Sequence, residues 1–349
     1  MLKDFIREMV ETPGLSGYES RVSKVIEKYF KSYSDDMRRD KLGNLVALKK
    51  GRLGETKKIM LAAHMDEIGL MVKKIDEKGF IQFTTIGGVD QRTLLTQEVI
   101  IHGEKDLFGI IGNKPPHILE EEEKKKAVKI EDMLIDVGLS KEEVEKVISV
   151  GSPISIRRKM ISLQNDVISA KALDDRAGVA VMYECLKELD KMNHDCDVYA
   201  VSTVQEEVGL RGAKTSTYEI FPDIGIAIDV GFGYTPELSK DDTSELGKGP
   251  AIAFGANIHP KVYEGLIKVA KEYNLPYQEE AYPAGTGTDA WIMQITQSGI
   301  ATGLLSIPLR YMHTSVETID LNDIKYAGKL LANFIVSLNH EDLEGMLCY

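Results

Sequence analysis

The 349-residue sequence predicts an α/β fold in which helices cover both faces of a mostly parallel sheet, with a small β-rich segment inserted into it. Two almost uncharged apolar segments, residues 58–64 and 224–230, have the composition of buried parallel strands. They alternate with segments of helical period, such as residues 179–186, as in a three-layer α/β/α domain. From residue 69 to residue 164, short alternating segments are separated by glycine and charged turns, a spacing that favours a small barrel or sandwich.

The first part of the chain is predicted to contain two helices and two strands. Residues 2–10 are amphipathic and are followed by a helix-breaking Pro-Gly pair. Ser16 followed by Glu19 has the spacing of a capping box, which predicts that the second helix begins there. Two strands are expected next, residues 45–50 and then the apolar segment that ends at His64.

The α/β pattern resumes after residue 164, so the main domain is predicted to be discontinuous. It comprises residues 1–68 and 165–349, and residues 69–164 form the inserted β-rich domain. Further strands are expected at residues 198–204, 224–230 and 301–307, with helices at residues 260–273 and near the C-terminus.

Composition excludes several classes of function. The net charge of -12, from 43 basic and 55 acidic residues, would repel phosphate backbones, so no nucleic-acid partner is expected. No apolar run approaches the roughly 20 residues that cross a bilayer, so no membrane association is expected either. The N-terminus lacks a basic stretch followed by an apolar core, which predicts a cytoplasmic protein.

Five segments place His, Asp or Glu at the end of a predicted strand or in the loop after it. They are AAHMDE (62–67), ALDDRAG (172–178), VQEEVG (204–209), IDVGFG (228–233) and YMHTSVE (311–317). In open α/β sheets, sites form at the carboxyl ends of the parallel strands. We therefore expect these loops to converge on one crevice.

The first and third segments of this set suggest metal chemistry. On an extended chain Asp66 faces the same side as His64 and can accept its second imidazole N–H, which would leave the other nitrogen for a metal. Glu206 and Glu207 follow an apolar strand, where two carboxylates are costly to desolvate without cations or protons. One of them is expected to bind metal and the other to face a bound water.

Asp174, Asp229 and His313 complete the set. Together with His64 and the glutamate pair they give two histidines and three or four carboxylates, which suits zinc, cobalt or manganese better than calcium. A site with two divalent ions roughly 3.5–4 Å apart activates a water and polarises a carbonyl, and a glutamate moves the proton to the leaving amine. This chemistry is amide hydrolysis. Asp174 is assigned as the bridging ligand because a short carboxylate can reach both ions.

Several segments together resemble the aminopeptidases of metallopeptidase family 42, glutamyl and leucyl aminopeptidases that form hollow tetrahedral particles and have sometimes been labelled endoglucanases. The segments are TPGLSGYE, AAHMDEIGLMV, TIGGVDQRTL, SAKALDDRAG, STVQEEVGLRGA, AIDVGF, LGKGPAI, GTGTDAW and MHTSVE. The resemblance runs over nearly the whole chain. Its members hydrolyse N-terminal residues from short peptides, which are therefore the expected substrates.

The resemblance implies a role for each candidate residue. The metal ligands would be His64, Asp174, Glu207, Asp229 and His313, with Asp174 bridging, Glu206 as the general base and Asp66 behind His64. The inserted segment would be a PDZ-like dimerisation domain, and the dimers would assemble into a dodecamer. The loop that contains Gly287, Thr288 and Asp289 resembles a family segment beside the substrate pocket.

Other functions remain open at this point. A dinuclear deacylase or carboxypeptidase uses similar ligands with a different pocket. A glycoside hydrolase needs two facing carboxyl groups and aromatic side chains on which sugars stack. With a single Trp and 7% aromatic residues, the chain has few such side chains. A catalytically inactive protein could still assemble into the hollow particle, but it would have no need to retain Glu206.

Overall fold

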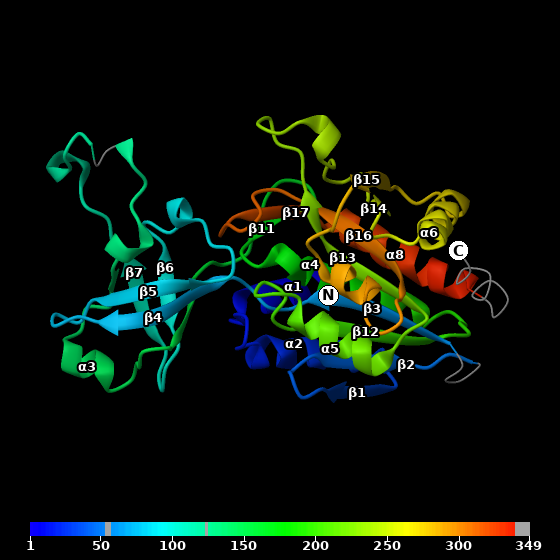
Figure 1. Cartoon of the computed structure of the whole chain (residues 1–349), viewed down its shortest axis with the longest axis horizontal. Coiled ribbons are helices and arrows are strands. Elements are labelled where there is room, and N and C mark those ends of the chain that lie inside the picture. The colour runs from blue at the N-terminus through cyan, green and yellow to red at the C-terminus, as the bar shows by residue number, and fades with distance from the viewer. Residues whose placement is uncertain (53–56, 123–124, 339–349) are drawn as a thin grey trace.

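The computed structural model describes residues 1–52, 57–122 and 125–338. Its α-helices are α1 (Leu2–Glu11), α2 (Ser20–Phe30), α3 (Lys141–Glu145), α4 (Leu173–Leu189), α5 (Arg211–Ile220), α6 (Pro260–Glu272), α7 (Asp289–Gln294) and α8 (Leu321–Ser337). Figure 1 shows two bodies side by side: a large α/β part and a smaller β-rich part. None of the described helices is long and apolar enough to cross a bilayer.

The large part contains an eight-stranded mixed sheet in the order β1-β2-β12-β3-β13-β16-β14-β15. Its strands are β1 (Asp36–Arg39), β2 (Leu45–Lys49), β3 (Lys58–His64), β12 (Asp197–Thr203), β13 (Ile224–Phe232), β14 (Ala251–Gly255), β15 (Gln278–Tyr282) and β16 (Ala301–Leu309). The four central strands are parallel. Strands β14 and β15 are also parallel to each other, but β2 and β14 run antiparallel to their inner neighbours, so the sheet is mixed and only partly matches the expected mostly parallel sheet.

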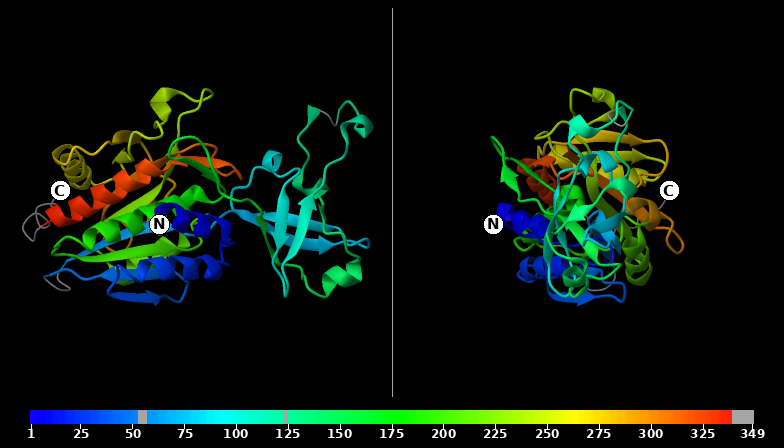
Figure 2. Two further views of the ribbon diagram at one scale, coloured as in Figure 1. Left: turned by 180° about the vertical axis from the view of Figure 1, so that it is seen from behind. Right: turned by 90° about the vertical axis from the view of Figure 1, so that its left-hand side faces the viewer.

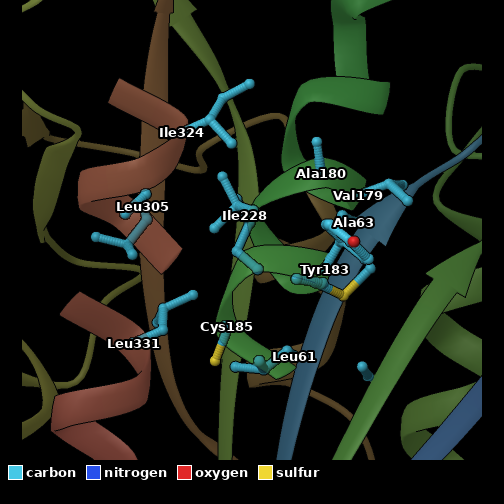
Figure 3. Packing of buried hydrophobic residues seen from close by; sticks show 14 of the residues in the cluster. Leu61, Ala63, Val179, Ala180, Tyr183, Cys185, Ile228, Leu305, Ile324 and Leu331 are labelled. Atoms are coloured by element: carbon cyan, nitrogen blue, oxygen red, sulfur yellow. The ribbon is translucent and has the colours of Figure 1, made fainter. Parts of the chain in front are cut away.

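Helices cover both faces of the sheet. Helices α4 and α8 pack against each other and against one face, with α1, α2 and α6 in the same core. Figure 3 shows this core, with Tyr183 and Cys185 on α4, Leu61 and Ala63 on β3, and Leu331 extending from α8. Helices α5 and α7 cover the other face through a second cluster that includes Met60. The predicted arrangement of helices on both faces is therefore confirmed.

The smaller part is a closed barrel in the order β4-β5-β8-β7-β6-β9. The strands are β4 (Gly69–Ile75), β5 (Ile81–Ile86), β6 (Glu98–Ile101), β7 (Leu107–Ile111), β8 (Ile135–Asp136) and β9 (Pro153–Ile156). Their inward side chains form a separate apolar core. Figure 2 shows the barrel projecting from one end of the large part. A small β-rich unit was predicted here, and the structure contains one.

A three-stranded sheet joins segments from distant parts of the chain. It has the order β10-β11-β17, with β10 (Ile161–Ser162), β11 (Val167–Ala170) and β17 (Glu317–Asp320). Strand β10 therefore pairs outside the barrel although it lies within the predicted inserted segment. Strand β11 lies after residue 164, where the α/β pattern resumes, yet it pairs with β10 and β17 and belongs to this smaller sheet.

The expected capping box of α2 is wrong. The helix begins at Ser20, with Glu19 in the N-cap position. The hydroxyl of Ser16 donates instead to the carboxylate of Asp66, at 2.6 Å. The Glu19 carboxylate accepts from the backbone amides of Gly17 and Gln205, at 2.7 and 3.2 Å. Tertiary hydrogen bonds therefore take the place of the local cap.

Candidate metal centre

The predicted site residues lie together beyond the carboxyl ends of the central strands. His64 is the last residue of β3, and Glu206 and Glu207 lie in the turn that follows the adjacent strand β12. Asp229 lies within β13, two residues after Ala227, the last residue of β13 that pairs with β3. Asp174 reaches the same place from the first turn of α4 and not from the main sheet, and His313 follows β16.

Asp174 lies between the two histidines. Its Oδ1 atom is 3.1 Å from Nε2 of His64, and its Oδ2 atom is 3.2 Å from Nε2 of His313. The His313 Nε2 atom is also 3.5 Å from Oε1 of Glu207. Each carboxylate oxygen of Asp174 therefore faces a different imidazole, which is the geometry that a bridging carboxylate requires.

Backbone carbonyls select the same tautomer for both imidazoles. Nδ1 of His64 lies 3.2 Å from the carbonyl oxygen of Asp66, and Nδ1 of His313 lies 3.0 Å from that of Gly88. Because a carbonyl oxygen only accepts hydrogen bonds, each Nδ1 must carry the donated proton. In each neutral ring the Nε2 lone pair then points toward the acidic centre, as it does in metal-binding histidines.

Two groups of potential ligand atoms are compact enough to hold an ion. One atom each from His64, Asp174 and Glu207 lie within 4.8 Å of one another, and so do atoms from His64, Asp175 and Asp229. Asp175 was not among the predicted ligands. Its carboxylate accepts from the backbone amides of His64 and Gly178, at 3.2 and 3.0 Å, so it already binds the backbone that presents the site.

The titration behaviour of these groups fits a cation site. Burial raises the pKa of Glu206 to about 10, that of Glu207 to about 7 and that of Asp229 to about 8, and neighbouring carboxylates add to each shift. The hydrogen bond with Asp174 raises the pKa of His313 to about 9. So many buried acids are stable as anions only beside positive charge. A mixed nitrogen and oxygen donor set of this kind suits divalent transition metals.

Asp66 differs from its expected role. Its carboxylate lies 3.6 Å from Nδ1 of His64, beyond hydrogen-bond range, and only its backbone carbonyl is closer. The carboxylate oxygens instead accept from the backbone amides of Glu206 and Glu207, at 3.0 and 3.3 Å, and from the hydroxyl of Ser16. Asp66 thus holds the turn that carries the glutamate pair.

Glu317 was not singled out from the sequence. Its buried carboxylate accepts from the backbone amides of Leu173, Asp174 and His313, at 2.8, 3.2 and 2.9 Å. It therefore joins the segment of one proposed ligand to that of another. Its position four residues after His313 is a sequence signal that could have drawn attention to it.

A buried charge network supports the other side of the site. Glu67 pairs with Lys171 and with Arg176, and it also accepts from the amide of Gly14 at 3.0 Å. Arg176 is completely buried and donates to the backbone carbonyls of Met65 and Thr12, at 3.1 and 2.7 Å. These cations are already paired, so they do not neutralise the acids at the centre.

The proposed substrate loop borders the same site. Asp289 is buried, its Oδ2 atom accepts from the hydroxyl of Thr203 at 2.6 Å, and Oδ1 finds no donor among the described residues. Burial raises the pKa of Asp289 to about 6. Thr288 caps α7 by accepting from the amide of Ala290 at 3.3 Å, whereas Gly287 is exposed.

Comparisons with known proteins agree with this geometry. The family model of M42 glutamyl aminopeptidases matches residues 43–330. The chain is 39% identical to the lysyl aminopeptidase of Pyrococcus furiosus, over 97% of this chain and 98% of that protein. The solved structure of an aminopeptidase from the archaeon Desulfurococcus kamchatkensis superposes with a TM-score of 0.93, at 41% identity, covering 100% of this chain and 98% of the other.

A further solved structure is that of the TET1 peptidase of Pyrococcus horikoshii, which assembles into a tetrahedron or a large octahedral shell. It shares 32% identity and a TM-score of 0.85, covering 97% of this chain and 100% of the other. The chain thus matches the family along most of its length in sequence and in fold. It belongs to the M42 glutamyl aminopeptidase family and is accordingly an aminopeptidase, a hydrolase that acts on peptide bonds.

Proposed function

We propose that this aminopeptidase removes N-terminal residues from short peptides with the help of two divalent metal ions. The ligands are His64, Asp174, Glu207, Asp229 and His313, with Asp174 shared between the ions. The observation that carries the proposal is the position of Asp174, whose two oxygens face His64 and His313 at 3.1 and 3.2 Å. Zinc or cobalt suits these donors best, and manganese is an alternative.

When bound, the two ions supply positive charge that lowers the pKa of a water and polarises the scissile carbonyl. Glu206 is the general base in this proposal. Its Oε2 atom is 3.9 Å from Nε2 of His64, so it lies beside the ligands without belonging to either compact group. It takes the proton from the water and returns it to the leaving amine.

Asp66 fixes the position of this base through the backbone. Because its carboxylate accepts from the amides of Glu206 and Glu207, the base and a ligand begin from the same anchored turn. Asp289 and Gly287 are proposed to border the bound N-terminal residue. The uncompensated Oδ1 atom of Asp289 supports a contact with a positively charged or hydrogen-bond-donating part of the substrate.

The barrel is proposed to be a PDZ-like dimerisation domain, and dimers are proposed to assemble into a dodecamer in the cytoplasm. The outward side chains of β7 support this role, because Phe108 and Ile110 are 62% and 53% exposed. Apolar residues that alternate outward on one strand are typical of a surface that a second subunit covers. The assembly of the TET1 relative is consistent with this proposal.

The test is hydrolysis of aminoacyl p-nitroanilides by the chelated protein, followed by restoration with zinc, cobalt or manganese one at a time. The panel includes lysyl, glutamyl and leucyl substrates and one N-blocked substrate. We expect release that depends on metal and on a free N-terminus. Release from the blocked substrate would contradict an aminopeptidase, because a free N-terminus would not be needed. The absence of release with any metal would favour a deacylase, and activity that survives chelation would contradict the metal mechanism.

Glu206→Gln separates the base from the ligands. We expect this variant to retain both ions and to lose turnover by about 10²–10⁴-fold, because the amide cannot accept the proton. His64→Ala and Asp229→Ala should lower metal content as well. Full activity of Glu206→Gln would refute the role of the base.

A further inference from the structure

The barrel reaches the metal centre through the turn that follows β5. This strand ends at Ile86, and the next two residues, Gly87 and Gly88, lie against proposed ligands. The carbonyl oxygen of Gly88 lies 3.0 Å from Nδ1 of His313. The acceptor that holds the Nδ1–H tautomer of His313 is therefore supplied by the inserted barrel and not by the α/β part.

Neither glycine has room for a side chain. A Cβ atom on Gly88 would lie 3.1 Å from Nδ1 and 3.2 Å from Cε1 of His313, closer than ordinary van der Waals contact. Gly87 has a φ of +74°, and a Cβ atom there would lie 2.8 Å from Cγ2 of Ile68 and 3.4 Å from the Cβ atom of Glu207. The two glycines let the backbone approach both ligands closely.

A second contact joins the barrel to the loop that carries His313. The side-chain amide of Gln97 donates to the hydroxyl of Ser315 at 3.2 Å and to the carbonyl of Thr93 at 2.9 Å. His313 has a φ of +59°, an uncommon conformation for a residue with a side chain. The contact of Gln97 with Ser315 thus adds support from the barrel to the bond between the His313 amide and Glu317, which holds this conformation within the loop.

We propose that the Gly87–Gly88 turn of the barrel is a positioning element of the metal centre, which sets the orientation and tautomer of His313. This inference rests on the proposed function in one respect, the assignment of His313 as a ligand. Partners that orient a ligating imidazole typically change metal affinity by about 10–100-fold when they are altered. The barrel would thus contribute to metal binding in addition to any role in assembly.

Gly88→Ala tests the inference, because the added methyl group would displace the His313 ring from the carbonyl that orients it. The metal-free protein is titrated with Co²⁺ and with Zn²⁺, and binding is followed by calorimetry and by the visible spectrum of Co²⁺. We expect the affinity for one of the two ions to fall by about 10–100-fold while the other is unchanged. His313→Ala marks complete loss of that ion.

Gly112→Ala is the matched control. It also adds a methyl group to the barrel, but a Cβ atom at this position would meet no atom within 4 Å. We expect its titration to match that of the unaltered protein. Gln97→Ala keeps both glycines and removes the contact with Ser315, so it should weaken the same ion to a smaller extent.

Thermal unfolding of each metal-free variant and light scattering show whether the fold and the particle are intact. Should Gly88→Ala fail to fold, the Gln97→Ala titration decides the question. Variants that bind both ions as tightly as the unaltered protein overturn the inference. An unaltered protein that binds fewer than two ions overturns the proposed function instead, so the two failures are distinguishable.

Discussion

At the scale of single residues, carboxylates that bind backbone amides are as important to the site as those proposed to bind metal. Asp66 accepts from the amides of Glu206 and Glu207, and Glu317 accepts from those of Asp174 and His313. Each of these two carboxylates therefore fixes two functional side chains at their backbone. A displacement of these side chains by a fraction of an ångström would lower the catalytic rate.

Ser16→Ala tests whether Asp66 must itself be held. The variant removes the hydroxyl that donates to Asp66 at 2.6 Å but leaves both amide donors in place. A hydrogen bond to a charged group contributes about 1.5 kcal/mol, so we expect kcat to fall by up to about tenfold with KM nearly unchanged.

Steady-state kinetics with matched metal loading measure this effect. Ser20→Ala is the control, because Ser20 is exposed at the start of α2. A lower melting temperature with unaltered kcat would show that Ser16 matters only for stability.

The raised pKa values predict how the stability of the metal-free protein depends on pH. Burial raises the pKa of Glu206, Glu207 and Asp229 to about 10, about 7 and about 8, so the folded state holds protons that the unfolded chain has released. The free energy of unfolding must then fall as pH rises through this window. His313, with a pKa of about 9, contributes with the same sign above about pH 6.5.

We expect the melting temperature of the metal-free protein to fall between about pH 5 and about pH 8. Calorimetric scans in chelating buffer measure this dependence. Saturating zinc should reverse the trend, because cations bind better where protons have left. Asp229→Asn should reduce the slope, and a melting temperature that rises over this range in chelator would contradict the assignment of these shifts.

At the scale of elements, the sequence patterns located strands and helices well but did not locate long-range partners. The apolar segments at residues 58–64 and 224–230 were expected as strands and are β3 and most of β13. Ser16 and Glu19 have the spacing of a local cap, yet Ser16 bonds to a residue 50 positions away. The hydrogen bond between Gly88 and His313 spans 225 positions, and no periodic pattern can show such a contact.

The same reasoning explains which site residues could be found. His64 ends one apolar central strand, and Glu206 and Glu207 follow another, where the topology of an α/β sheet places functional groups. Asp174 was included because it follows a predicted strand, but that strand, β11, lies outside the main sheet, so the residue was found although the expected topology does not hold there. Glu317 was missed because its carboxylate oxygens accept hydrogen bonds from backbone amides. The identity of the residues that carry those amides does not reveal such bonds.

The pairing of α4 with α8 predicts the stability cost of one buried leucine. Leu331 lies on α8 in the core that Figure 3 shows and is completely buried. Leu331→Ala should lower the free energy of unfolding by about 2–5 kcal/mol through lost burial and a residual cavity. Chemical denaturation at fixed protein concentration measures the change.

Lys329→Ala is the control on the same helix, because Lys329 is exposed. Its effect should stay within about 0.5 kcal/mol. Since α4 also carries Asp174, a loss of metal affinity in Leu331→Ala would show that the packing of α4 reaches the site. Equal stability of the two variants would contradict the assigned core.

At the scale of the whole molecule, the chain forms two bodies that meet at the proposed metal centre. A pocket between them is lined by Leu94 and Gln97 of the barrel part and by Asp174, Glu207 and His313. Arg21 of α2 forms a further ion pair with Asp106 of the barrel part, at 3.0 Å. The barrel therefore contacts the α/β part in two places, one beside the proposed metal ligands and one at the ion pair between Arg21 and Asp106.

Removal of the barrel separates its two proposed contributions. Residues 69–156 contain all six barrel strands, and a deletion that ends at residue 156 keeps β10 paired with β11. If the barrel mediates assembly, light scattering should detect a monomer. The deletion also removes Gly88. If the carbonyl of Gly88 orients His313, the monomer should bind one of the two ions with reduced affinity.

A matched variant distinguishes these effects. Phe108→Glu places a charge on the exposed face of β7 and leaves the Gly87–Gly88 turn unchanged, so it should prevent assembly without loss of either ion. Light scattering and metal titration of both proteins then give four independent results. An unchanged particle after the deletion would refute the assembly role, because the remaining α/β part would supply the whole interface. Unchanged affinity for both ions would show that the α/β part alone holds His313 in place.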